Sequence, residues 1–232
     1  MIHYDFKGRL QYIPGGALSV NMSAWPAAVS GNWWEPTTGT FTVVAAYQAI
    51  GAASLAASYV NLANPGTYDA APGTAPTWDS TNGWIFAAAS SQYLTTGIIP
   101  NSDYSVIVRF TSGSGYLIGT SSSRYGETPV FTLRQTAADR NWYNNGDRYE
   151  ASTWTSGVMC AAGKVAYKDG TSQGAISGGS NTWSYQFVIG AQNLIDMGQD
   201  GYLTGNIQAL AIYSTTLDAT QVAEITTNMA AL

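Results

Sequence analysis

The residues best suited to ligand recognition lie between positions 140 and 150, in the segment RNWYNNGDRYE. Aromatic rings alternate there with amide and carboxylate side chains, a combination that binds sugars through ring faces and hydrogen bonds. Two alternatives remain open, because such residues also form cross-strand pairs or contacts between subunits. The candidate sugar-binding residues are Trp142, Tyr143, Asn144, Asn145, Asp147 and Tyr149.

Nucleophilic and metal chemistry have few candidates in this sequence. The single histidine, His3, lies far from any nucleophile signal, so we expect neither a Ser-His-Asp arrangement nor a histidine-ligated metal. The single cysteine, Cys160, has no His or Lys beside it and is predicted to be a small buried residue. Residues 113–115 (GSG) lead into strand-like residues and not into a helix, which argues against a phosphate loop.

Charge and hydropathy argue against two classes of partner. The net charge is −5 and the nine basic residues are scattered, so no basic run could neutralise the neighbouring phosphates of a nucleic acid. No apolar stretch approaches the roughly 20 residues that a membrane-spanning helix needs. Residues 1–10 lack the apolar core of a signal peptide. A polar, aromatic-rich chain without that signal is expected to leave a cell by lysis, as virion proteins do.

The spacing of apolar residues and turns predicts an all-β fold. Residues 64–77 contain two Pro-Gly pairs and are expected to form a loop, whereas 51–62 fit either a short helix or a strand. Asn-Gly at 145–146 and Asp-Gly at 169–170 predict tight hairpins. Strands are expected at 41–47, 83–86, 92–94, 104–110, 116–119, 130–135, 187–190 and 206–213.

The two ends of the chain are predicted to differ. At the C-terminus, Asp218 as N-cap and Gln221 three residues later predict a capped helix with a buried apolar stripe. Residues 1–40 have an irregular pattern and are interpreted as an N-terminal arm, followed by one domain over residues 41–232. The exposed-looking tryptophans of the arm are the candidates for attachment or oligomerisation: Trp25, Trp33 and Trp34.

Four segments in the second half share an order and spacing typical of one family. They are 165–170 (VAYKDG), 187–191 (FVIGA), 205–213 (GNIQALAIY) and 217–225 (LDATQVAEI). Over residues 53–232 the chain thereby resembles laminin-G-like domains of the concanavalin A-like superfamily. The resemblance implies a two-sheet antiparallel jelly-roll sandwich that binds glycans or proteins. Similar domains occur in tailed-bacteriophage virion proteins.

The resemblance also implies two kinds of site chemistry to look for. Laminin-G-like domains sometimes bind calcium through loop oxygens, although aspartates at such positions also cap turns. Concanavalin-type glycosidases place closely spaced carboxylates on one strand, whereas the glutamates here are isolated, so we expect no enzyme activity. The weak calcium candidates are Asp139, Asp147, Asp196 and Asp200.

These observations favour a non-enzymatic virion structural protein of a tailed bacteriophage. It would decorate a capsid or belong to a tail fibre, self-associate, and contact other virion proteins through the arm. The alternative is a carbohydrate-binding module for cell-surface glycans, and a glycoside hydrolase is the weaker third hypothesis. No cofactor is expected apart from calcium in the second case.

Overall fold

The computed structural model describes residues 2–4, 10–12, 31–121, 130–135, 139–144, 147–152, 156–176, 183–194 and 198–232. The chain divides into two units, Met1–Ser30 and Gly31–Leu232. In the first, β1 (Ile2–Tyr4) and β2 (Leu10–Tyr12) form an antiparallel hairpin. Across the described parts of both units, no helix has the length and apolar character needed to cross a membrane.

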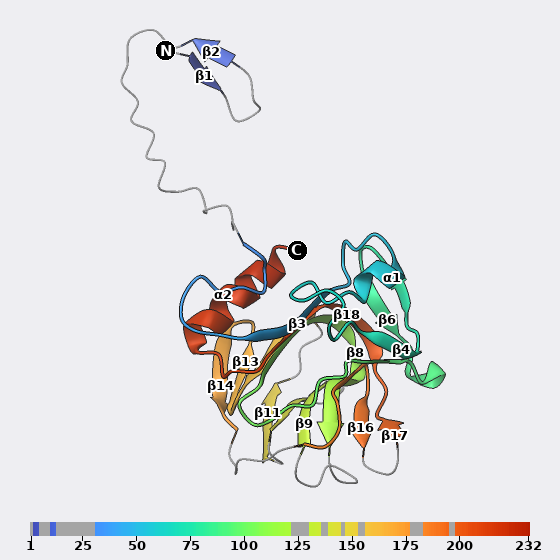
Figure 1. The fold of residues 1–232 in the computed structure, drawn as a ribbon. Coiled ribbons are helices and arrows are strands. Elements are labelled where there is room, and N and C mark those ends of the chain that lie inside the picture. Colours follow the sequence, from blue (N-terminus) through green and yellow to red (C-terminus); the bar gives the residue numbers. More distant parts are fainter. Residues whose placement is uncertain are drawn as a thin grey trace. The chain divides into compact units, whose positions relative to one another are not determined.

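The larger unit is organised around one long strand, β8 (Ser105–Ser121), which takes part in two sheets (Figure 1). Its first half pairs with β18 (Thr204–Tyr213) and β12 (Ser156–Ala162). Its second half pairs with β9 (Val130–Gln135) and β15 (Val188–Ile189). The two sheets are therefore joined by continuous backbone hydrogen bonding.

The first sheet extends from both sides of the β18–β8–β12 centre. Beyond β18 lie β3 and β6, with β5 outside β6, and beyond β12 lie β13 and β14. The bounds of these outer strands are Val43–Gln48 (β3), Thr77–Asp79 (β5), Gly83–Phe86 (β6), Val165–Lys168 (β13) and Thr171–Ala175 (β14).

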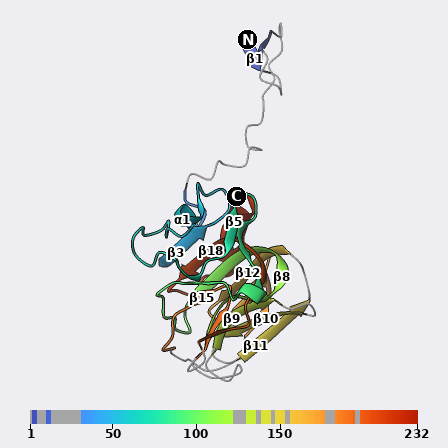
Figure 2. The ribbon, with the colours of Figure 1, turned by 90° about the vertical axis from the view of Figure 1, so that its right-hand side faces the viewer.

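The second sheet lies face to face with the first (Figures 1 and 2). Beyond β15 lie β7 and β4, and beyond β9 lie β10 and β11. β16 adds one parallel pair to β8, and β17 pairs with β16. These strands are β4 (Ala71–Thr74), β7 (Tyr93–Thr95), β10 (Asp139–Asn144), β11 (Asp147–Ser152), β16 (Gln192–Leu194) and β17 (Gly198–Asp200).

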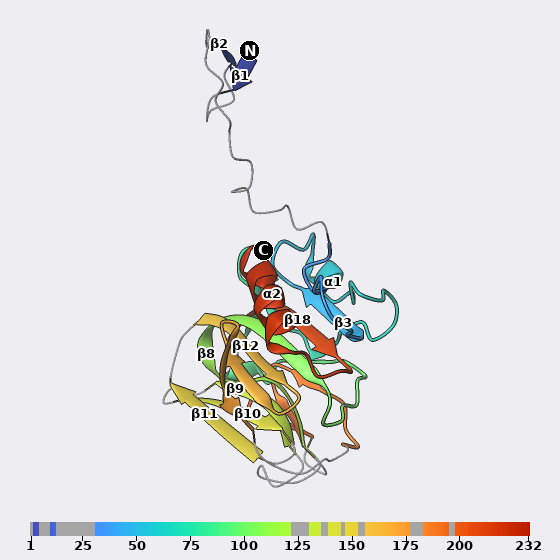
Figure 3. The same cartoon turned by 90° about the vertical axis from the view of Figure 1, so that its left-hand side faces the viewer.

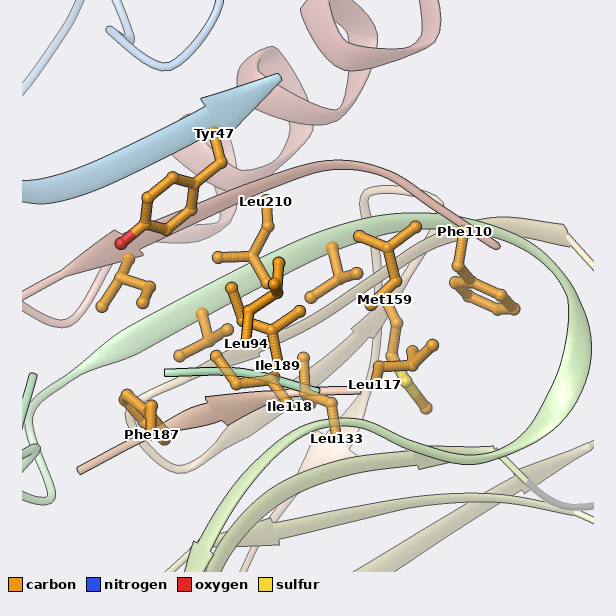
Figure 4. Close-up of a cluster of buried hydrophobic side chains, with 14 of the residues drawn as sticks. Tyr47, Leu94, Phe110, Leu117, Ile118, Leu133, Met159, Phe187, Ile189 and Leu210 are labelled. Atoms are coloured by element: carbon orange, nitrogen blue, oxygen red, sulfur yellow. The ribbon is translucent and has the colours of Figure 1, made fainter. Parts of the chain in front are cut away.

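Two apolar cores hold the layers together. The first fills the space between the sheets, with side chains such as Phe110, Leu133 and Leu210 (Figure 4). The second lies between the outer face of the first sheet and the C-terminal helix α2 (Ala219–Ala230), which covers β18 and β12 (Figure 3). Burying apolar surface on both faces of one sheet explains why β18 is apolar on both faces.

The C-terminal helix begins as the sequence predicts. Asp218 Oδ1 accepts from the Gln221 N–H at 2.9 Å, and Gln221 Oε1 accepts from the Asp218 N–H at 3.0 Å, which completes a capping box. Val222, Ile225 and Met229 are buried in the second core. Two shorter helices, α1 (Leu55–Ser58) and the 3-10 turn η2 (Ala88–Ser90), complete the described elements.

The predicted all-β jelly-roll sandwich is confirmed, with two local differences. Residues 64–77 were expected to form a loop, yet they include the short strand β4 at the sheet edge, where Pro72 is tolerated. The expected strands 104–110 and 116–119 are one strand. Ser112, Gly113 and Gly115 adopt positive φ, so the backbone bends without leaving its partners.

The bend in β8 predicts that Gly113 does not accept a side chain. A Cβ there would lie 1.7 Å from the Thr204 carbonyl oxygen, and φ is already +120°. We expect Gly113→Ala to lower the free energy of unfolding by about 3 kcal/mol or more in denaturant titrations, because a packed backbone must move.

Gly198→Ala is the matched control for that substitution. Gly198 also has positive φ (+76°) but has no atom within 4 Å of its Cβ position. We expect Gly198→Ala to lower the free energy of unfolding only by the cost of a positive φ in alanine, about 1 kcal/mol. Equal losses in the two variants would show that the close approach at Gly113 is unimportant.

The buried thiol gives a second prediction for the fold. Cys160 is fully buried in the second core, and burial raises the pKa of its thiol. Because the thiolate is the reactive form, native protein at pH 8 should react very slowly with a thiol reagent and quickly after denaturation. Rapid labelling of the folded protein would contradict this packing.

Candidate functional site

A cleft of about 310 Å³ opens at the edge of the second sheet, where the loop after β7 meets the segment before β15. We call it the rim cleft. Its position follows from the topology, because β7 and β15 are hydrogen-bonded neighbours and their flanking loops leave the sheet together. The lining residues are Gly97, Ile99, Ser184, Tyr185, Gln186 and Asn193.

The main chain of segment 184–187 is held in place by hydrogen bonds from two side chains and to one neighbouring carbonyl. Thr120 Oγ1 of β8 donates to the Tyr185 carbonyl at 2.8 Å, and Asn193 Nδ2 donates to the Gln186 carbonyl at 3.1 Å. The Phe187 N–H donates to the Ile98 carbonyl at 2.8 Å. The cleft is therefore preformed, which lowers the ordering cost of binding.

Gln186 connects the two walls of the rim cleft. Its Oε1 accepts from the Gly97 N–H, so its Nε2 remains available as a donor. The Tyr185 hydroxyl likewise has no partner among the described residues. The cleft therefore offers the partly exposed ring of Tyr185 and two polar groups without a hydrogen-bond partner among the described residues, the Tyr185 hydroxyl and Gln186 Nε2.

Tyr68 adds an exposed aromatic ring next to the cleft. Its side chain is 45% exposed, and a Cβ on Gly97 would lie 3.4 Å from its ring. Its φ is +59°, which is costly for a residue with a side chain and persists only where neighbours enforce it. Tyr68 thus extends the rim cleft by an aromatic surface in a constrained position.

Two buried residues enforce the backbone of Tyr68. The hydroxyl of Tyr47 donates to the Tyr68 carbonyl at 2.6 Å, and burial raises the pKa of Tyr47, so this donor keeps its proton. Asn61, fully buried, donates to the carbonyl of Thr67 at 2.8 Å. Asp69 accepts from the Asn61 N–H at 2.8 Å. The loop is fixed on both sides of the exposed ring.

The rim cleft and Tyr68 together contain no charged side chain. Ile99, 52% exposed, and the two tyrosines supply apolar surface, whereas Gln186 and Asn193 supply amides. Such a site suits an uncharged ligand with one apolar face and hydroxyl groups at its edge.

The predicted sugar-binding hairpin is formed as a hairpin. β10 and β11 pair antiparallel, with Asn144 opposite Asp147 as the turn residues require. Trp142 is in register with Tyr149 on one side and with Leu133 of β9 on the other. Asn145 and the side chains of Trp142, Tyr143, Asn144, Asp147 and Tyr149 lie outside what the structure describes, so their ligand role stays a prediction.

The tryptophans proposed for attachment have different positions from those expected. Trp33 and Trp34 are 7% and 6% exposed and belong to the second core, with their rings 5.4 Å apart. The Trp34 carbonyl accepts from the buried Tyr213 hydroxyl at 2.7 Å. Their side chains are therefore packed inside the larger unit, and Trp25 lies outside the described residues.

The calcium candidates are not brought together among the residues that the structure describes. Asp139 and Asp147 begin β10 and β11, Asp200 ends β17 opposite Gln192, and Asp196 lies outside the described part. Within the described ranges, no group of three His, Cys, Asp or Glu residues could hold a metal ion.

Neither Tyr68 nor Tyr185 was a candidate site residue on sequence grounds. Tyr68 follows a Pro-Gly turn, and Tyr185 lies in a short polar stretch between Trp183 and Phe187. Neither environment differs from that of an ordinary loop tyrosine. Only the pairing of β4 with β7 and of β7 with β15 brings their two loops together.

Comparison with known proteins supports the fold. No family model matches the sequence, and no curated protein matches it. A sialidase mutant from Trypanosoma rangeli with trans-sialidase activity is similar in structure, with a TM-score of 0.54 and 12% identity over 81% of this chain and 33% of the other. The chain thus spans about a third of that sialidase, and at this identity the likeness shows the fold alone.

Two further solved structures overlap less well. Domain 4 of AbnA, a GH43 arabinanase from Geobacillus stearothermophilus in complex with arabinotriose, has a TM-score of 0.42 and 15% identity, covering 80% of this chain and 98% of that domain. T. rangeli sialidase with the inhibitor DANA has a TM-score of 0.38 and 14% identity over 53% of this chain and 23% of the other.

The prediction of a virion structural protein is wrong in the light of these comparisons. The solved structure that overlaps this chain with a TM-score of 0.54 is a sialidase mutant, and it gives no support to a phage origin. The sandwich was read correctly, but a fold shared by many functions did not justify the role assigned to it.

Removal of one hydroxyl group tests whether Tyr47 restrains the backbone of Tyr68. Tyr47→Phe removes the donor to the strained Tyr68 carbonyl and should cost about 1–2 kcal/mol of unfolding free energy. Amide NMR shifts of Tyr68 and Gly97 should change, because both belong to the loop region that this hydroxyl restrains.

Tyr213→Phe is the matched control for this pair of measurements. It removes an equivalent buried hydroxyl, bonded to the Trp34 carbonyl in the second core. We expect a similar loss of stability with unchanged amide shifts at Tyr68 and Gly97. Unchanged shifts in Tyr47→Phe would contradict the restraint.

Proposed function

We propose that the larger unit is a non-catalytic carbohydrate-binding module that holds a neutral sugar in the rim cleft. The observation that carries the proposal is the exposed ring of Tyr68, which is fixed in a costly backbone conformation. It lies beside a preformed cleft whose amide and hydroxyl groups are available for hydrogen bonds with a ligand. A laminin-G-like assignment of the domain is part of the same proposal.

Sugar chemistry fits the polar and apolar parts of this site. The face of a pyranose or furanose ring has C–H groups that pack on an aromatic ring, while its hydroxyls take part in hydrogen bonds at the edge. Tyr68, Tyr185 and Ile99 provide the first kind of surface. Gln186 and the Tyr185 hydroxyl provide the second.

The size of the cleft and its lack of charge limit the ligands that it can bind. A volume of about 310 Å³ is at the lower end of the range for small-molecule sites, about 300–1,000 Å³, and favours one sugar unit at a time. Because the lining is uncharged, no group there would compensate a carboxylate, so neutral sugars are favoured over acidic ones.

The proposal excludes catalysis for a chemical reason. Glycoside hydrolysis generally needs two carboxylates on either side of the scissile bond. The rim cleft is lined by neither Asp nor Glu. Binding without cleavage is what this set of side chains supports.

The proposal can be tested with the purified chain on an array of neutral and acidic oligosaccharides, followed by calorimetry with the best neutral ligand. Tyr185→Ala and Tyr68→Ala should each weaken binding about fivefold, since an aromatic contact contributes about 1 kcal/mol and 1.4 kcal/mol is tenfold. Products should remain absent after prolonged incubation.

Tyr202→Ala is the control, because Tyr202 is a partly exposed tyrosine that packs near Tyr93 and does not line the cleft. The Tyr202→Ala variant should bind the neutral sugar with the affinity of the unmodified protein. Full affinity in the Tyr185→Ala variant would overturn the assignment of the site. Preference for an acidic sugar would overturn the ligand class, and release of product would overturn the non-catalytic role.

A further inference from the structure

A second cleft, of about 540 Å³, lies between the last turns of α2 and the outer face of the first sheet. Its floor comes from β8 and β12, and its walls come from β18, the β13–β14 turn and α2 itself, which Figure 3 shows over this sheet. It shares no residue with the rim cleft. The residues on which the argument depends are Arg109, Asp169, Gln208 and Thr226.

Two polar side chains in this cleft lack a hydrogen-bond partner among the described residues, and the polar atom of one of them, Thr226, is buried. Thr226 is 8% exposed, and its Oγ1 is buried with no hydrogen bond. Gln208 is 7% exposed, and its side-chain amide has no partner among the described residues. Leaving a buried group such as the Thr226 hydroxyl unpaired is costly, so native proteins usually satisfy it with water or a ligand.

The carboxylate of Asp169 is fixed at the mouth of the cleft. Its Oδ1 accepts from the Val158 N–H at 2.8 Å, and its own N–H donates to the Val158 carbonyl at 2.8 Å. The second carboxylate oxygen is not used by a described residue. The positive φ of Asp169, +47°, is the conformation that the hairpin turn requires.

Arg109 provides donors in the same cleft. Its Nη1 donates to the main-chain oxygens of Met229 at 2.6 Å and of Leu232 at 3.1 Å, which fixes the guanidinium under the end of α2. The remaining guanidinium N–H groups have no partner among the described residues. Partial burial lowers the pKa of Arg109, yet an arginine stays charged at any physiological pH.

We propose that this cleft is a second binding site, and that its ligand is a neutral polyhydroxylated molecule such as a single sugar unit or a polyol. A hydroxyl both donates and accepts, so neighbouring hydroxyls can pair with Asp169, Arg109, Gln208 and Thr226 at once. A ligand with a net charge of either sign would meet one like charge, because Arg109 and Asp169 line the same cleft.

The chemistry of this second site differs from that of the rim cleft. It relies on fixed charged and amide groups and not on an exposed aromatic ring. The two sites lie on different sheets, so one module would hold two sugars at once. The inference is independent of the rim cleft, and either site can exist without the other.

The test titrates a methyl hexoside into the Tyr185→Ala variant of the whole chain, with amide NMR as readout. Tyr185→Ala weakens binding in the rim cleft, so shifts at low hexoside concentration should concentrate at Arg109, Asp169 and the last turns of α2. Adding Thr226→Val, which removes only the hydroxyl, or Gln208→Ala should weaken binding about tenfold. Gln173→Ala, a glutamine on β14 outside the cleft, is the matched control and should change nothing.

Two further ligands test whether the second cleft prefers neutral molecules to charged ones. The uronate of the same hexose and the amino acid glycine should each bind at least tenfold more weakly than the hexoside. Stronger binding of either would overturn the neutral class. Absence of hexoside shifts at the cleft, or shifts unaffected by Thr226→Val and Gln208→Ala, would overturn the site itself, whatever the result for the rim cleft.

Discussion

The close approach of two backbones at Gly113 and Gly205 is the constraint on which the sandwich depends. A Cβ on Gly205 would lie 2.1 Å from the Ser112 carbonyl oxygen, and one on Gly113 would lie 1.7 Å from that of Thr204. Only glycine permits this contact at these φ values. Because β8 bends there and stays hydrogen-bonded to β18, one strand can belong to both sheets, and the sheets are set face to face by the covalent chain itself.

The position of both clefts follows from that arrangement. The second half of β8 holds β15, and β15 holds β7, so the loops that form the rim cleft start from neighbouring strands of a rigid sheet. The first half of β8 supplies Arg109. Its side chain lies on the outer face of the first sheet and donates to the main chain at the end of α2. Sites on loops gain precision when the strands beneath them are fixed in this way.

Local chemistry in the sequence was enough to predict the elements with strong signals. The capping box of Asp218 and Gln221, the Asn-Gly and Asp-Gly hairpins and the doubly apolar strand β18 depend on neighbouring residues, and all are found where expected. The continuity of β8 could not be predicted. A Gly-Ser-Gly segment usually ends a strand, and its partner at Thr204 is about ninety residues away.

The sites were harder to predict because they depend on long-range packing. The Trp33-Trp34 pair looks like an exposed arm until α2 and Tyr213 are placed against it. The strained backbone of Tyr68 is held by a hydroxyl on β3, and the unpartnered Thr226 hydroxyl is buried where α2 packs on the first sheet. None of these partners is near in sequence, so residue type and spacing alone favoured the aromatic hairpin at 140–150.

The segment that enters the larger unit has a mechanical consequence. Between residues 34 and 38 it is bonded once to β18 and twice to α2. The Trp34 carbonyl accepts from the Tyr213 hydroxyl, the Thr37 N–H donates to Glu224 Oε1 at 2.9 Å, and the Thr38 carbonyl accepts from Gln221 Nε2 at 3.0 Å. A force applied through the chain before residue 31 would therefore load α2 and the end of β18 before it reached β3. The end of β18 and the helix that covers the second cleft would be the first elements to bear a pulling force on the chain.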